Sequence, residues 1–154
     1  MYTASAEIGG LSDDCRFAYL EVTGDFVYTA RVTQTNFMGE FSKAGIMIRN
    51  SLTPTSKMVF LGVNGIGQVS VIKRLSSLPA IGQWLDFYIG GYLRFERKGN
   101  TINTYISYDG RDYELIEEVE FLNLNNTIYL GVASNSKNTF GYNYSLFENI
   151  KLSQ

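Results

Sequence analysis

The sequence predicts an all-β fold, a sandwich or barrel of about ten short antiparallel strands. Apolar and polar residues alternate with a period of two in many short segments, the pattern of a strand buried on one side. The 154 residues include 11 tyrosines, 10 phenylalanines and 15 glycines against 2 prolines. Aromatic residues suit strands and glycine suits the turns between them. No repeat or linker interrupts the pattern, so we expect one domain covering residues 1–154.

The first half of the chain contains five expected strands. They cover residues 17–21, 26–33, 44–49, 57–63 and 68–73. In the third of them, Ala44, Ile46 and Ile48 are expected on one face, with Met47 and Arg49 on the other. Asn-Gly-Ile-Gly at 64–67 is a strong hairpin turn between the last two.

The second half begins with the least regular stretch, residues 75–90, which contains the only tryptophan. We interpret it as a long connection with a short strand from Trp84 to Tyr88. The strands expected after it cover residues 92–98, 101–108, 112–121, 127–134 and 144–152. Gly99-Asn100 and Asp109-Gly110 are expected hairpin turns. Apolar residues at helical spacing occur within 113–121, but the preceding Asp-Gly turn favours a strand there.

The charge balance argues against polyanionic partners. The net charge is −2, and no segment carries the cluster of Lys and Arg that binding to phosphates requires. We therefore expect neither nucleic acid nor an anionic membrane surface as a partner. No apolar run approaches the length of a membrane span, so no membrane insertion is expected.

The chain has no histidine and one cysteine, Cys15. This composition removes the commonest general base, the usual nucleophile pairs, an internal disulfide and cysteine-rich zinc sites. The first residues lack the charged and apolar regions of a signal peptide. Either the protein is cytoplasmic, or Met1 begins an excised module that is extracellular or at the cell surface.

Several motifs occur in an order that resembles the bacterial concanavalin A-like family of lectins and glucanases. They are Gly-Asp-Phe at 24–26, Ala-Arg-Val at 30–32, Lys-Ala-Gly-Ile-Met-Ile-Arg at 43–49, Gly-Tyr-Leu-Arg-Phe-Glu-Arg-Lys-Gly-Asn at 91–100 and Ser-Tyr-Asp-Gly at 107–110. The match runs almost end to end. The resemblance implies an antiparallel jelly roll of two stacked sheets, one of them concave.

The resemblance also implies a domain of a kind often found beside glycan-active or cell-surface modules. The preferred hypothesis is a non-catalytic, lectin-like carbohydrate-binding module whose glycan lies on the concave sheet or at the loop end near Trp84. The alternative is a structural or protein-interaction domain that accompanies neighbouring domains of a larger secreted or cell-surface protein. A glycoside hydrolase or lyase is a third, less favoured hypothesis.

Alternation suggests which side chains would contact a sugar. Arg49 opposes buried isoleucines, and Arg94 and Glu96 oppose Leu93 and Phe95. In the next strand, Asn103 and Tyr105 alternate with Ile102, Thr104 and Ile106 and are expected on the other face. Aromatic faces with planar donors and acceptors suit sugar rings and hydroxyls. If these side chains meet on the concave sheet, Arg49 joins Arg94 there. The expected ligand-binding residues are Arg49, Arg94, Glu96, Asn103, Tyr105 and Trp84. For each there is a structural alternative: an ion pair on the sheet for the arginines, a lid over the sandwich for Trp84.

Catalysis would require two carboxylates on either side of the scissile bond. Glu96, Glu118 and Glu120 are the candidates, and the Glu-x-Asp-x-(x)-Glu pattern of retaining jelly-roll glucanases is absent. We therefore expect no catalytic residues.

Calcium is the one metal that the sequence allows as a hypothesis, because it accepts carboxylate and carbonyl oxygens. Asp13 and Asp14 lie in an expected loop, and Glu148 lies in the last strand. If the first and last strands are neighbours, these three could share one structural ion. No calcium-loop motif is present, and Asp-Asp also occurs as ordinary turn chemistry.

Overall fold

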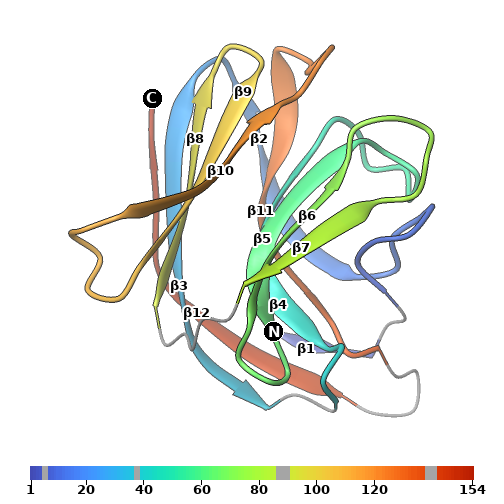
Figure 1. The fold of residues 1–154 in the computed structure, drawn as a ribbon, viewed down its shortest axis with the longest axis vertical. Coiled ribbons are helices and arrows are strands. Elements are labelled where there is room, and N and C mark those ends of the chain that lie inside the picture. Colours follow the sequence, from blue (N-terminus) through green and yellow to red (C-terminus); the bar gives the residue numbers. More distant parts are fainter. Residues whose placement is uncertain (5–6, 37–38, 86–90, 138–141) are drawn as a thin grey trace.

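The computed structural model describes residues 1–4, 7–36, 39–85, 91–137 and 142–154. They form two six-stranded antiparallel sheets that face each other as a sandwich (Figure 1). In sheet 1 the order is β1 (Tyr2–Thr3), β12 (Asn143–Ser153), β3 (Phe26–Asn36), β8 (Tyr92–Lys98), β9 (Thr101–Ser107) and β10 (Glu114–Glu120). In sheet 2 it is β2 (Arg16–Thr23), β11 (Thr127–Asn135), β4 (Lys43–Arg49), β5 (Met58–Asn64), β6 (Val69–Arg74) and β7 (Ile81–Leu85).

The main core lies between the two sheets. Ile46 and Ile48 of β4 are buried in it against the other sheet's Leu93 and Phe95 of β8, as the alternation predicts. Burial of each such side chain stabilises the fold by roughly 1.5–3 kcal/mol. Because alternate residues of a strand point to opposite faces, the remaining side chains of the two sheets lie on opposite outer faces of the sandwich. The predicted all-β two-sheet sandwich is confirmed.

A second apolar cluster covers the outer face of sheet 2. Ile8 from the N-terminal segment packs over Met47, Phe60 and Ile72 there. Every residue of β4 and β5 is consequently buried, although alternate side chains of both strands point away from the main core. Residues 7–15 thus act as a cover, which we call the N-terminal strap.

The three predicted hairpin turns are confirmed. They join β5 to β6, β8 to β9 and β9 to β10. The segment 113–121 contains a strand, as predicted, although β10 covers only Glu114–Glu120; its register shifts between Leu115 and Glu117. Within the described ranges, no helix has the length and hydropathy to cross a membrane.

Two expectations about the strands differ from the structure. The strand that contains Trp84 begins three residues earlier than expected, at Ile81, and β7 runs to Leu85. Residues 86–88 of the expected strand lie outside the described residues. The two-residue strand β1 was not predicted, because its pairing with β12 depends on a partner far along the chain.

Candidate functional site

Four of the predicted ligand-binding residues lie together on the outer face of sheet 1. Arg94 and Glu96 of β8 stand opposite Tyr105 and Asn103 of β9. The Tyr105 hydroxyl donates a hydrogen bond to Glu96 Oε2 at 3.1 Å. Cross-strand neighbours on one face of a sheet are in side-chain contact range. We call this surface the polar face.

Glu96 is an anion within a network on the polar face. The Lys98 ammonium, 3.0 Å away, holds the pKa of Glu96 below its ordinary value, and the hydrogen bond from Tyr105 adds to this. The pKa of Tyr105 is raised by its burial and by the nearby Glu96 carboxylate. A general acid in glycoside hydrolysis needs a raised carboxyl pKa, so this direction is unfavourable for such a role.

Arg49 lies elsewhere, which corrects the expectation that it joins Arg94. It belongs to β4 in sheet 2, on the opposite outer face, and it is buried. Its Nη1 donates to Asp13 Oδ2 at 2.6 Å, and its other two nitrogens donate to the carbonyls of Ser51 and Thr53. All three nitrogens have partners, so Arg49 anchors the N-terminal strap.

Asp13 is saturated by the same anchor. Arg74 donates to both of its carboxylate oxygens, at 2.7 and 3.0 Å, and the Gly9 backbone N–H donates to Oδ1 at 2.9 Å. Two guanidinium groups thus neutralise one buried carboxylate. They take the place that a bound cation would have in the calcium hypothesis.

The predicted calcium set is not brought together. β1 does pair with the last strand, but Asp13 and Asp14 precede β2 and lie over sheet 2. Glu148 is in sheet 1, opposite Arg31 of β3. Across the residues whose placement is described, no three His, Cys, Asp or Glu side chains form a group able to hold a metal ion.

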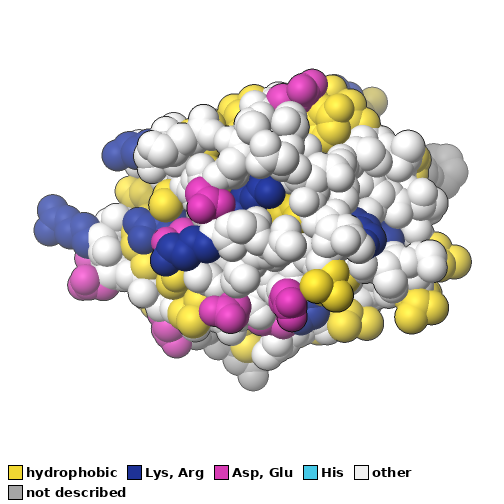
Figure 2. Space-filling view, turned by 90° about the horizontal axis from the view of Figure 1, so that it is seen from above, with side chains coloured by type: hydrophobic (Ala, Val, Ile, Leu, Met, Phe, Trp, Pro, Cys, Tyr) yellow, Lys and Arg dark blue, Asp and Glu magenta, His cyan; other side chains and the backbone are white. Residues whose placement is uncertain are grey.

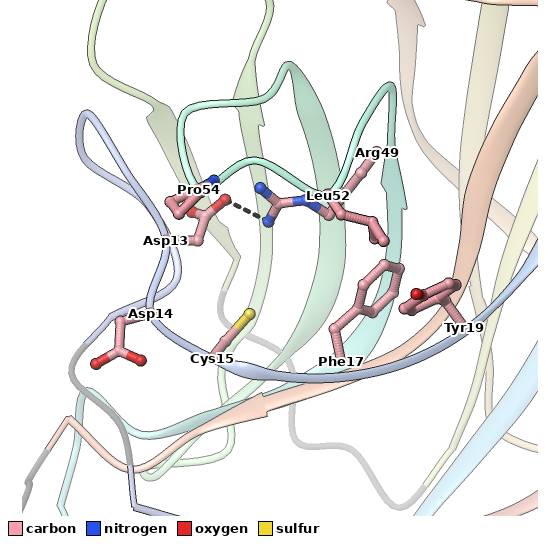
Figure 3. Close-up of a pocket in the computed structure, with 8 residues that line it drawn as sticks. All are labelled: Asp13, Asp14, Cys15, Phe17, Tyr19, Arg49, Leu52 and Pro54. Atoms are coloured by element: carbon pink, nitrogen blue, oxygen red, sulfur yellow. Dashed lines mark hydrogen bonds and ion pairs between the residues drawn. The ribbon is translucent and has the colours of Figure 1, made fainter.

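A pocket of about 320 Å³ lies beside this anchor (Figure 3). Phe17 and Tyr19 rise from β2 toward it, and Cys15 points the same way. Burial, assisted by the Asp13 charge, raises the pKa of the Cys15 thiol to about 11. The thiol is therefore protonated near neutral pH, which makes it a poor nucleophile. The remaining lining residues are Asp13, Asp14, Arg49, Leu52 and Pro54.

Trp84 lines a separate pocket of about 320 Å³, which we call the Trp84 pocket. Trp84 lies on β7, opposite Ser70 of β6, and 43% of its surface is exposed. The Lys43 ammonium lies 5.9 Å from the centre of its ring. The pocket is lined by Glu40, Phe41, Asn64, Ile66, Gln68 and Trp84.

Two turns hold the walls of the Trp84 pocket. Asn64 Oδ1 accepts hydrogen bonds from the backbone N–H groups of Ile66 and Gln68, which shapes the β5–β6 turn. The Gly65 backbone N–H donates to the Glu40 carbonyl at 3.2 Å. A Cβ at Gly65 would collide with the carbonyl of Gly39, so the close approach of these turns requires glycine.

Sequence patterns missed several residues of these surfaces. Glu40, Phe41 and Ile66 come from turns, where no periodicity marks a shared pocket. Tyr113, which stacks on Arg94, was expected inside the strand 112–121, whereas β10 begins at Glu114, and the pattern gave no sign of that contact. The charges seen in Figure 2 are interspersed, with no large area of one sign on that face.

The comparisons establish the fold. No family model and no curated protein matches the chain. A functionally unknown Saccharomyces cerevisiae protein matches with a TM-score of 0.80 and 14% identity, over 98% of this chain and 84% of that one. The carbohydrate-binding module CBM66 from Bacillus subtilis has a TM-score of 0.56 and 14% identity, over 93% and 83%.

Enzymes and lectins share the architecture as well. The GH43 protein BlXynB from Bacillus licheniformis has a TM-score of 0.65 and 13% identity, over 87% of this chain but 32% of that one. Sheep galectin-11 has a TM-score of 0.56 and 10% identity, over 90% and 97%. The chain therefore has the concanavalin A-like jelly-roll fold that lectins and carbohydrate-binding modules share.

Proposed function

We propose that the protein is a non-catalytic, lectin-like module that binds a sugar residue of a glycan in the Trp84 pocket. The observation that carries this proposal is a partly exposed indole beside polar side chains in one pocket of about 320 Å³. That volume is at the lower end of the usual range for ligand pockets, and it suits one sugar unit with its neighbours left in solvent.

The lining has the chemistry that a sugar ring needs. The C–H face of a pyranose stacks on an aromatic ring, and its hydroxyls need planar donors and acceptors. Trp84 would supply the platform, Phe41 and Ile66 the apolar walls, and Gln68 with Glu40 the polar groups. The fold shared with CBM66 and the galectins supports the same class of ligand.

The carboxylates favour binding over hydrolysis. Glu96 and Glu118 both stand opposite Asn103, one on each side of β9, so their strands are roughly 10 Å apart. Glu96 has a lowered pKa and is paired with Lys98. Neither the lowered pKa nor the ion pair with Lys98 suits the protonated acid of a glycosidase pair.

A glycan array followed by calorimetry with the best oligosaccharide tests this proposal. Trp84→Ala should lower the affinity about five- to thirtyfold, since stacking of one ring contributes on the order of 1–2 kcal/mol. Trp84→Phe should retain part of it. The matched controls are Tyr19→Ala, in the pocket of Figure 3, and Tyr105→Ala, on the polar face. The proposal is rejected if no glycan binds, or if Trp84→Ala binds like the wild type.

A further inference from the structure

The arginines of the described chain that are not fully exposed fall into two groups. Arg49, Arg74 and Arg97 are buried, and every guanidinium nitrogen donates a hydrogen bond. Arg31 and Arg94 are half-buried, and the Nε of each is buried without a hydrogen-bond partner. Buried donors in folded proteins are normally paired, so the second group is the exception.

Arg31 and Arg94 are neighbours on the polar face. They lie on adjacent strands, where Arg31 stands opposite Tyr92, and Arg94 opposite Thr29. Each is therefore the diagonal neighbour of the other, within reach of long side chains. Two like charges at this spacing repel each other unless an anion is present.

Aromatic rings hold both guanidinium groups in place. Arg94 stacks on Tyr113, with 3.4 Å from its Cζ to the ring centre, and Arg31 lies over Tyr92 at 5.5 Å. Stacking occupies the flat face of a guanidinium and leaves its N–H edge available. That edge is the part that binds carboxylate and sulfate oxygens.

No carboxylate on the described residues forms an ion pair with either arginine, although the Glu96 charge is near enough to Arg94 to interact with it. The ion pairs of the structure involve other groups, and Glu96 is already engaged by Lys98 and Tyr105. Glu148 stands opposite Arg31 in the ladder without forming an ion pair with it. Neither guanidinium group thus has an ion-pair partner on the described residues, and the oxyanion of a ligand would supply one.

We propose that Arg31 and Arg94 form a binding site for an oxyanion carried by a ligand, either the carboxylate of an acidic sugar or a sulfate ester. The buried and unpartnered Oδ1 of Asn103, on the same face, supplies an acceptor for a hydroxyl group next to that oxyanion. The site lies on the opposite outer face from the Trp84 pocket and does not depend on it.

Calorimetry at low ionic strength tests the site with three probes: an oligogalacturonate, a sulfated oligosaccharide and a neutral oligosaccharide. Arg31→Gln and Arg94→Gln should each weaken binding of the acidic probe at least about tenfold, as expected for loss of a charge-assisted contact. Arg94→Lys should restore part of it. Arg16→Gln, which removes an exposed charge on β2, is the matched control and should bind like the wild type.

Two further variants distinguish binding at this arginine pair from binding elsewhere on the domain. Glu148→Gln should strengthen binding, because it removes the carboxylate opposite Arg31. Tyr19→Ala, in the pocket of Figure 3 on sheet 2, should leave binding of the acidic probe unchanged. Tighter binding of the carboxylate or of the sulfate probe identifies the source of the oxyanion, and either supports the site. The proposal is overturned if neither acidic probe binds, or if folded Arg31→Gln and Arg94→Gln bind like Arg16→Gln.

Discussion

At the scale of single residues, the same residue type serves different purposes according to its partners. Arg49 and Arg74 surround Asp13 and hold the N-terminal strap on sheet 2. Arg94 and Arg31 lie on aromatic rings and form no ion pair with a carboxylate of the described residues. A charged side chain with every nitrogen satisfied is part of the structure, whereas one with unused donors is open to a ligand.

The buried anchor leads to the first prediction, Asp13→Asn. The substitution removes the carboxylate from two buried guanidinium groups, so we expect the free energy of unfolding to fall by roughly 3–5 kcal/mol. Urea unfolding followed by tyrosine fluorescence or circular dichroism measures it. Asp112→Asn, at an exposed aspartate between β9 and β10, should change stability by no more than about 0.5 kcal/mol. A calcium-dependent rise in stability that Asp13→Asn abolishes would contradict the assignment of Asp13 to the arginines.

The strap also has an acid-sensitive contact. Burial alone would raise the pKa of Glu7, but its hydrogen bonds and ion pairs with Lys137 and Lys43 outweigh burial and lower it below 4.5. A lowered folded-state pKa contributes stability above the unfolded value, and that contribution is lost as the pH falls through the folded-state pKa. Near neutral pH, the free energy of unfolding of the wild type should exceed that of Glu7→Gln by about 1 kcal/mol.

Thermal unfolding of both proteins at a series of pH values tests this linkage. The difference between them should stay constant at neutral pH and shrink once the pH falls below 4.5. A difference that grows on acidification would show that Glu7 is protonated more easily in the folded protein, opposite to this account.

At the scale of elements, hairpin turns position the candidate sugar site. The β5–β6 turn carries Ile66 and Gln68, and its contact with the loop before β4 brings Glu40 and Phe41 to the same pocket. β7 supplies Trp84 as the edge strand of sheet 2. The pocket therefore depends on three segments that meet only in the folded chain.

Gly65→Ala tests the contact between the two turns. The added methyl group would collide with the Gly39 carbonyl and displace the loop that carries Glu40 and Phe41. We expect a loss of roughly 1–3 kcal/mol in stability and clearly weaker glycan binding by a protein that still folds. Gly131→Ala on β11 is the control, because its Cβ would collide with the Ala18 carbonyl at the other edge of sheet 2. It should lose stability without losing glycan affinity. Equal glycan affinity for Gly65→Ala and the wild type would show that the contact between the two turns does not shape the sugar site.

Local patterns predicted most strands, since alternation and Asn-Gly or Asp-Gly turns depend on neighbouring residues. They also placed Arg94, Glu96, Asn103 and Tyr105 on one face, because the Gly99-Asn100 turn sets the register of that hairpin. The sheet that each strand joins was not predictable in this way. Arg49 was expected near Arg94 but lies on the other sheet, since β4 pairs with β11 and β5.

At the scale of the whole molecule, the sandwich presents two outer faces with different chemistry. On sheet 2, the N-terminal strap covers the centre and leaves the Trp84 pocket and the pocket of Figure 3 as separate hollows. On sheet 1, the polar face is open and carries the two stacked arginines. This arrangement allows a neutral sugar and an acidic group to bind on opposite sides of one domain.

The central claim is that a sugar ring stacks on Trp84, and the chain offers a direct probe because this is its only tryptophan. The most direct measurement is a titration of tryptophan emission with the oligosaccharide that binds best on an array. We predict a saturable shift in emission with the same dissociation constant as calorimetry, unchanged in Tyr19→Ala. Calorimetric binding without any change in Trp84 emission would contradict the account.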